Sequence, residues 1–162
     1  MTMQADGLHH SLSADRMNEN DRARSKVEFR KELEKRLQVS GIKPTLQRIE
    51  VGALLLESPI HLSAEQILNI LRDNGSRISK ATIYNTLNLF TQHGLVREVS
   101  VDSARQFYDS TSSPHHHFYN VDTGELIDIH LDEVEIRVLP DLPPGTEAQD
   151  VELIVRVRNK GD

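Results

Sequence analysis

The spacing of apolar residues changes near the middle of the chain, and this change constrains the fold more than any other feature of the sequence. Up to about residue 95 the apolar residues recur every three or four positions, as at Ile83, Leu87 and Phe90, which is the period of an amphipathic helix. From Val96 onwards they alternate with polar residues, as expected of strands that bury one face. The sequence therefore predicts an α+β fold in which helices come first and strands follow.

Capping residues divide the first half of the chain into separate helices. An amphipathic segment at residues 24–39 predicts the first helix, and Thr45, Ser63 and Ser79 are the expected N-caps of three more. A hydroxyl at such a position accepts a hydrogen bond from a free N–H of the first helical turn. Gln66 stands three residues after Ser63 and completes a capping box.

Two short alternating segments follow the last helix and are expected to pair. Residues 96–101 and 107–108 flank a turn at residues 102–103, which predicts a two-stranded wing. A helix, a turn, a capped helix over residues 79–94 and a wing follow one another in the order of a winged helix-turn-helix domain.

The outer face of the helix over residues 79–94 carries polar side chains that can reach phosphates or base edges in a DNA groove. They are Lys80, Tyr84, Asn85 and Asn88. The net charge of −6 is unevenly distributed: residues 22–100 hold thirteen Lys and Arg against eight acids, and residues 101–162 hold five against thirteen. A basic lobe can engage phosphates and an acidic lobe is repelled by them. We therefore expect double-stranded DNA to bind the N-terminal lobe, the alternative being an ordinary solvated helix face.

A run of small polar residues marks the boundary between two lobes. We expect a disordered tail at residues 1–21, which includes His9 and His10, a winged-helix DNA-binding domain at 22–109, a hinge at 110–114, and a dimerisation and ligand-sensing domain at 115–162. In this last domain strands are expected at residues 118–121, 126–129, 134–139 and 151–157. So small a lobe buries little on its own, so we expect a homodimer.

The absence of Cys limits the chemistry that the chain can perform. It excludes disulfides, thiolate zinc sites and cysteine nucleophiles, and it leaves His and carboxylates as the strong metal ligands. No apolar run reaches the roughly 20 residues that cross a bilayer, and the start lacks the order of a secretion signal. We expect no contact with a membrane and a cytoplasmic location.

Several motifs resemble those of the ferric uptake regulator (Fur) family. They are Thr45-Leu-Gln47-Arg48, His61-Leu-Ser-Ala-Glu65, Ile78-Ser-Lys-Ala-Thr-Ile-Tyr84-Asn, Pro114-His115-His116-His117-Phe118 and Thr123-Gly124-Glu125-Leu126-Ile127-Asp128. The resemblance runs from about residue 26 to 129. It implies a homodimer with a winged-helix lobe and an α/β dimerisation lobe, which binds AT-rich inverted repeats when loaded with metal. Arg48 joins the expected DNA contacts.

Carried over by this resemblance, the family's regulatory metal site falls on His61, Asp109, His115, His117 and Asp128. Alternate residues of a strand face the same side, so His115 and His117 can bind one ion while His116 faces away. Imidazole and carboxylate ligands suit iron, manganese or zinc without choosing among them. Because these residues flank the hinge, one ion could join the two lobes and set the DNA-binding geometry.

Departures from the usual family pattern resemble the iron response regulator (Irr) branch, whose members sense haem. Asn120 and Thr123 stand where relatives carry a Cys-x-x-Cys motif, so a four-Cys structural zinc site is not expected. A second metal site is incomplete, because it retains His116 and Glu135 but has Pro114 and Val151 at its other positions. The resemblance implies haem binding through His115, His116 and His117, with His61 as a candidate second ligand.

The resemblance favours a repressor whose DNA affinity is lowered by bound haem. Three other functions are weighed against it. A conventional metal-activated repressor would use the five-residue site and lose DNA binding on chelation. A metallohydrolase would use the same residue types to activate water, but no separate acid or base is evident, and we do not expect an enzyme. A winged helix that binds only protein would show no salt-dependent affinity for DNA.

Overall fold

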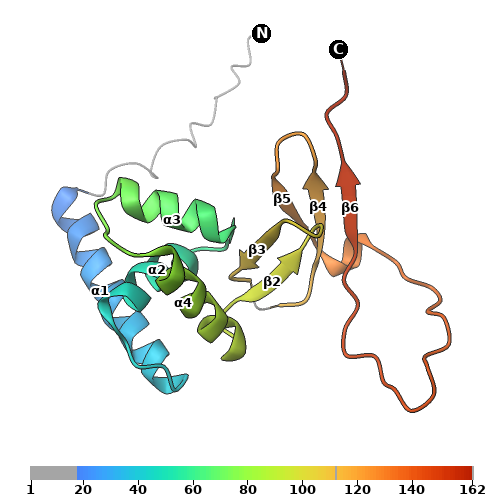
Figure 1. The fold of residues 1–162 in the computed structure, drawn as a ribbon, viewed down its shortest axis with the longest axis horizontal. Coiled ribbons are helices and arrows are strands. Elements are labelled where there is room, and N and C mark those ends of the chain that lie inside the picture. Colours follow the sequence, from blue (N-terminus) through green and yellow to red (C-terminus); the bar gives the residue numbers. More distant parts are fainter. Residues whose placement is uncertain (1–17, 112, 162) are drawn as a thin grey trace, which may run out of the picture.

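A computed structural model describes residues 18–111 and 113–161 (Figure 1). The helices are α1 (Glu19–Val39), α2 (Leu46–Leu56), α3 (Ala64–Asp73) and α4 (Lys80–Gln92), with a short 3-10 helix η1 (Leu131–Glu133). The strands are β1 (His61–Leu62), β2 (Arg97–Ser100), β3 (Gln106–Asp109), β4 (His116–Asn120), β5 (Leu126–Ile129) and β6 (Ile154–Val157). The fold is thus α+β, as predicted. Within the described ranges, no helix has the length and apolar character needed to cross a membrane.

The predicted helix starts are confirmed by their capping bonds. The side chains of Thr45, Ser63 and Ser79 accept hydrogen bonds from the backbone N–H groups three residues later. The Gln66 side chain also accepts a bond from the Ser63 N–H at 2.8 Å, so both halves of the capping box are present. These bonds are local, which is why the sequence alone could predict them.

The four helices enclose one hydrophobic core. Its fully buried members include Leu37 of α1, Leu55 of α2, Ile67 of α3 and Phe90 of α4. Each of these side chains lies on the inner stripe of its helix, so the apolar period seen in the sequence corresponds to real burial. The outer face of α4 is left exposed by this packing.

The wing is part of a three-stranded sheet. β2 and β3 pair antiparallel around the predicted turn, and β1 adds to the other edge of β3, giving the order β1-β3-β2. β1 has only two residues, too few to show an alternating pattern, and the sequence did not predict it. Its pairing places His61 directly opposite Asp109.

A second three-stranded sheet forms the C-terminal part, with the order β5-β4-β6. β5 pairs antiparallel with β4, while β6 pairs parallel with it after a long connection. The strand predicted at residues 126–129 is confirmed, and those predicted at residues 118–121 and 151–157 are confirmed in part, as β4 over residues 116–120 and β6 over residues 154–157. The strand predicted at residues 134–139 is wrong: these residues have no regular structure and belong to a loop that runs away from the sheet (Figure 1). Apolar and polar residues alternate in this segment, but among the described residues no strand lies beside it to form hydrogen bonds with it.

The first turn of α1 also differs from prediction. α1 begins at Glu19, with the Asn18 side chain accepting a bond from the Asp21 N–H, so residues 19–21 are helical rather than part of a tail. The rest of the predicted tail, including His9 and His10, lies outside the described residues.

The wing and the second sheet share a small hydrophobic core. Val99, Val101 and Phe107 of the wing pack with Tyr119 and Leu126 of the second sheet. Around this core the Arg105 guanidinium donates to the Tyr119 hydroxyl, and that of Arg156 donates to the Val101 carbonyl. The two lobes are therefore joined by packing as well as by the chain at residues 110–114.

This shared core predicts that the lobes unfold together. Phe107→Ala should lower the free energy of unfolding by about 3–5 kcal/mol, because it removes a buried ring from the contact between the sheets. Helix circular dichroism and NMR methyl signals of Ile154 should report one common transition in denaturant. The control Leu46→Ala, at a residue 59% exposed, should change stability by less than about 0.5 kcal/mol. Two separate transitions, with only the helical one shifted, would contradict a shared core.

Candidate metal centre

Five metal-ligating side chains gather where the two sheets meet. His61 comes from β1, Asp109 from the end of β3, His117 from β4 and Asp128 from β5, with His115 just before β4. One nitrogen or oxygen of each lies within 4.8 Å of all the others. Strand register explains part of this, because His61 is paired with Asp109 and His117 with Asp128, and paired residues of antiparallel strands project side by side.

The three imidazoles turn the same ring atom, Nε2, toward the two carboxylates. His61 Nε2 lies 2.7 Å from Asp128 Oδ1, and His115 Nε2 lies 2.8 Å from Asp109 Oδ2. His117 Nε2 is 3.3 Å from Asp109 Oδ2 and 3.6 Å from Asp128 Oδ1. Both sheets thus contribute to a single cluster rather than to separate ion pairs.

The residues present fit a bound divalent cation. The side chains of Asp109 and His117 are fully buried. His61 Nε2, His115 Nε2 and Asp128 Oδ1 are buried without a well-directed hydrogen bond, although they crowd together. Leaving buried polar atoms unsatisfied is costly, and a cation among them would accept their lone pairs. Nitrogen and carboxylate oxygen ligands suit iron, manganese or zinc.

The electrostatics of the cluster favour a cation as well. Burial alone would raise the pKa of Asp109, but hydrogen bonds with His117, His61 and the Thr111 N–H outweigh it and hold that pKa well below its ordinary value. Burial would lower the pKa of His61, but Asp109 and Asp128 outweigh it, so that pKa is raised. The cluster therefore keeps an ionised carboxylate inside the protein and attracts positive charge.

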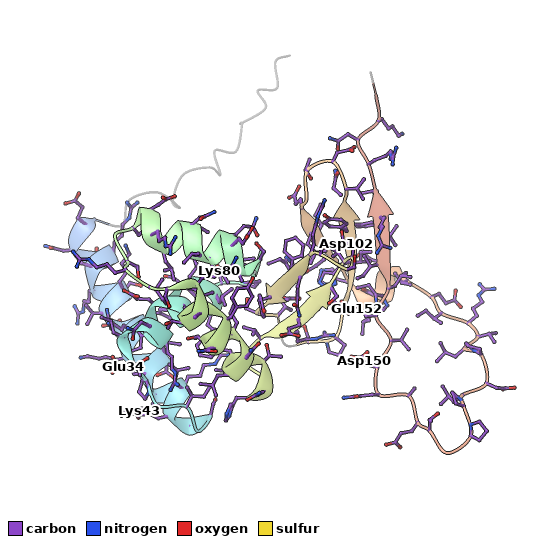
Figure 2. The ribbon with its side chains drawn as sticks, viewed as in Figure 1. Glu34, Lys43, Lys80, Asp102, Asp150 and Glu152 are labelled. Atoms are coloured by element: carbon purple, nitrogen blue, oxygen red, sulfur yellow. The ribbon has the colours of Figure 1, made fainter. Side chains whose placement is uncertain are left out.

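The outer nitrogens of two imidazoles are held by further contacts. His115 Nδ1 lies 2.7 Å from the Ser113 carbonyl oxygen, and His117 Nδ1 lies 3.0 Å from Glu152 Oε1. Glu152 lies against the second sheet, far from Lys80 on the helical part (Figure 2). Glu152 was not among the residues predicted for the site. No local signal could reveal it, since it meets His117 only because β6 pairs with β4.

The predicted hinge is tied at its first residue. The Ser110 hydroxyl accepts a bond from the Ile60 N–H and donates to the Ser58 carbonyl, at 3.2 Å each. The Thr111 N–H donates to Asp109 Oδ1 at 2.7 Å. The segment that leaves the wing is therefore fastened beside β1, next to the cluster.

His116 lies apart from the other two histidines of the triplet. Its Nδ1 accepts a hydrogen bond from the Leu153 N–H at 3.1 Å, on the opposite side of β4, as expected from strand alternation. The residues of the incomplete second metal site do not gather within the described part of the chain: Glu135 is exposed and pairs with Arg137. Asn120, one of the residues replacing cysteine, accepts backbone bonds in a turn instead.

The predicted DNA contacts occupy two places. The four on α4 are all exposed: Lys80, Tyr84, Asn85 and Asn88. Arg48 lies on α2, is partly buried, and donates to the Lys43 carbonyl at 2.8 Å. Lys80 lies 3.5 Å from Glu65 Oε1 and near the Tyr84 ring, so the start of α4 presents a polar, accessible surface.

Comparisons with known proteins agree with this arrangement. Residues 39–154 match the ferric uptake regulator family. The chain is 34% identical over 108 residues to the peroxide operon regulator of Bacillus subtilis, covering 65% of the chain and 74% of that protein. It is 33% identical over 127 residues to the ferric uptake regulation protein of Pseudomonas aeruginosa, covering 76% of the chain and 95% of that protein.

Solved structures are similar over most of the chain. The structure of the ferric uptake regulator from Pseudomonas aeruginosa with manganese has a TM-score of 0.60 and 30% identity, covering 80% of this chain and 98% of that one. The Vibrio cholerae regulator has a TM-score of 0.61 and 25% identity, covering 78% and 98%. The chain therefore belongs to the ferric uptake regulator family, whose members are DNA-binding transcription regulators and not enzymes.

Proposed function

We propose that the protein is a dimeric, cytoplasmic repressor whose DNA binding depends on a divalent metal ion. The observation that carries this proposal is the convergence of His61, His115 and His117 on two carboxylates at the junction of the lobes. The relative of known structure from Pseudomonas aeruginosa is described with manganese, which supports the same chemistry here. Iron, manganese and zinc all suit this ligand set.

The proposed control acts through the angle between the lobes. A bound cation would supply the positive charge that lets Asp109 and Asp128 lie close together. His61 and Asp109 belong to the sheet that carries the wing, and the remaining three ligands belong to the second lobe or its lead-in. Holding these groups together restricts the orientation of α4. In a dimer, two such helices must match successive turns of the DNA groove, so a change of lobe angle changes DNA affinity.

The proposed DNA surface is the exposed face of α4, with an AT-rich inverted repeat as the target. Lys80 supplies a charge for phosphate, while Tyr84, Asn85 and Asn88 can contact base edges or the backbone. Asn amides pair well with adenine in the major groove, and Asn85 therefore supports an operator that differs from those of relatives with Arg at this position. Arg48 would contact DNA only after giving up its bond to Lys43.

The metal dependence can be tested by gel shift on candidate inverted repeats. Adding Mn²⁺ to metal-free protein should raise DNA affinity by about 5–150-fold, the usual range for coupling between two sites, and EDTA should reverse the gain. His117→Ala should remove the response to Mn²⁺, because it deletes a buried ligand. Lys80→Ala should weaken DNA binding and reduce the slope of log affinity against log salt concentration by about one. Lys160→Ala, at an exposed residue of the second lobe, should change neither quantity. A DNA affinity that is the same with and without Mn²⁺ would contradict the metal-activated function.

Haem binding through His115, His116 and His117, with His61 as second ligand, is a second proposal, and it places the chain in the Irr branch. The triplet and the absence of Cys support imidazole as the axial ligand. All three imidazoles of the triplet are nearly fully buried, and two of them point into the cluster. Haem would therefore bind only after β4 opens at its start, and this opening would separate the metal ligands and lower DNA affinity.

Absorbance titration distinguishes the haem proposal from the metal proposal. Because haem and Mn²⁺ would share His115 and His117, saturation with Mn²⁺ should weaken haem binding at least tenfold. The triple alanine variant of the three histidines should lose the haem absorbance band. Haem that binds equally well to the Mn²⁺-saturated protein or to the triple variant would show that it does not use this site.

The uncovered face of the second sheet supports a second copy of the chain as its partner. Phe118 of β4 is paired with Ile127 of β5, and both are more than a third exposed. The loop between η1 and β6 adds further exposed apolar residues: Ile136, Val138, Leu139 and Leu142. Adjacent exposed apolar side chains such as Phe118 and Ile127 are typical of interaction surfaces. A homodimer would bury this face.

Sedimentation equilibrium tests the dimer. Phe118→Asp should shift the protein from dimer toward monomer at micromolar concentration, because the charge would be buried in the contact. Leu46→Asp, at an exposed apolar residue of α2, should leave the dimer intact. A monomeric parent protein, or equal behaviour of the two variants, would show that this face is not the dimer contact.

A further inference from the structure

The side chain of Glu152 contacts His117 on the edge of the imidazole ring that faces away from the cluster. Its Oε1 lies 3.0 Å from His117 Nδ1, while His117 Nε2 faces the carboxylates of Asp109 and Asp128. The two nitrogens project from opposite sides of the imidazole ring, so Glu152 lies outside the cluster and cannot reach a cation held within it. Any effect of Glu152 on such a cation must act through His117.

We propose that Glu152 is a positioning residue that holds His117 in the tautomer able to bind metal. This inference rests on the proposed metal site. A carboxylate is only an acceptor, so the proton between the two groups stays on His117 Nδ1. The lone pair of Nε2 is then free to face the cluster. An acidic partner behind a metal-binding imidazole also fixes the plane of its ring.

The neighbouring histidine shows why the charge of Glu152 matters. The Nδ1 of His115 meets the neutral carbonyl of Ser113, whereas that of His117 meets a carboxylate. Hydrogen bonds to an ionised acceptor are roughly twice as strong as bonds between neutral groups. His117 is fully buried and Glu152 is only 25% exposed, so water screens the pair weakly. His117 therefore has the firmest support of the clustered imidazoles.

Two hydrogen bonds of the next residue, Leu153, fix the position of Glu152 beside β4. The His117 N–H donates to the Leu153 carbonyl at 3.0 Å, and the Leu153 N–H donates to His116 Nδ1 at 3.1 Å. These bonds fasten residues 152–154 along the edge of β4 at the point where the histidines lie. A side chain at position 152 is thus placed by the sheet itself, and the carboxylate needs no further partner to reach His117.

Two substitutions at Glu152 test this role, with Glu147→Ala as the control at an exposed acid of the same loop. Glu152→Ala should weaken Co²⁺ binding to the full chain by about 10–100-fold, the usual effect of deleting such a partner, and should alter the Co²⁺ absorption spectrum. Glu152→Gln keeps an oxygen acceptor without the charge, so its loss should be several-fold smaller. Glu147→Ala should bind Co²⁺ as the parent does.

Long-range ¹H–¹⁵N NMR of the metal-free protein gives an independent measurement. The parent should show the proton of neutral His117 on Nδ1, and Glu152→Ala should shift it toward a mixture of tautomers while thermal unfolding stays cooperative. Unchanged tautomer populations together with Co²⁺ affinity within twofold of the parent would overturn the proposal, as would an equal loss in Glu147→Ala. If the parent itself binds no Co²⁺, the proposed metal function fails. The NMR measurement of the His117 tautomer, which needs no metal, then still tests whether Glu152 positions that ring. If Glu152→Ala does not fold, Glu152→Gln carries both measurements.

Discussion

Asp109 is the group around which the two lobes are organised. Its side chain is fully buried, and the Nε2 atoms of His61, His115 and His117 lie 3.5, 2.8 and 3.3 Å from one of its oxygens. A buried carboxylate without such partners would destabilise the fold by several kcal/mol. Because its partners come from both sheets, the sheets must stay close, and the same closeness creates a site with the charge and ligands that a divalent cation requires.

The shared hydrophobic core gives this arrangement a second support. Val101 and Phe107 of the wing pack against Tyr119 of the second sheet, so the wing is not free to move independently of the cluster. A change of lobe angle would disturb this packing and the ligand geometry together. This links the chemistry of the histidines to the position of α4, which lies in the other part of the molecule (Figure 1).

Sequence patterns predicted the helices well and the second lobe less well. The caps at Thr45, Ser63 and Ser79 depend on atoms three residues apart, so local sequence contains all the information needed. Residues 134–139 show the alternation of a strand, yet Ile136 and Val138 are exposed in a loop. Alternation predicts a strand only where another strand is available to pair, and that depends on the rest of the fold or on a second copy. β1 was not predicted, because its two residues are too few to show the alternation of apolar and polar residues that marks a strand.

The sequence by itself determined the ligand chemistry: without Cys, only His and carboxylates were available, and motif resemblance identified which of them would come together. The tertiary structure decided what surrounds them. Glu152 is 35 residues from His117 in the chain, and His61 is 48 residues from Asp109. Such contacts depend on which strands lie side by side. That choice comes from the burial of whole sheet faces and from non-local hydrogen bonds, which no short stretch of sequence encodes.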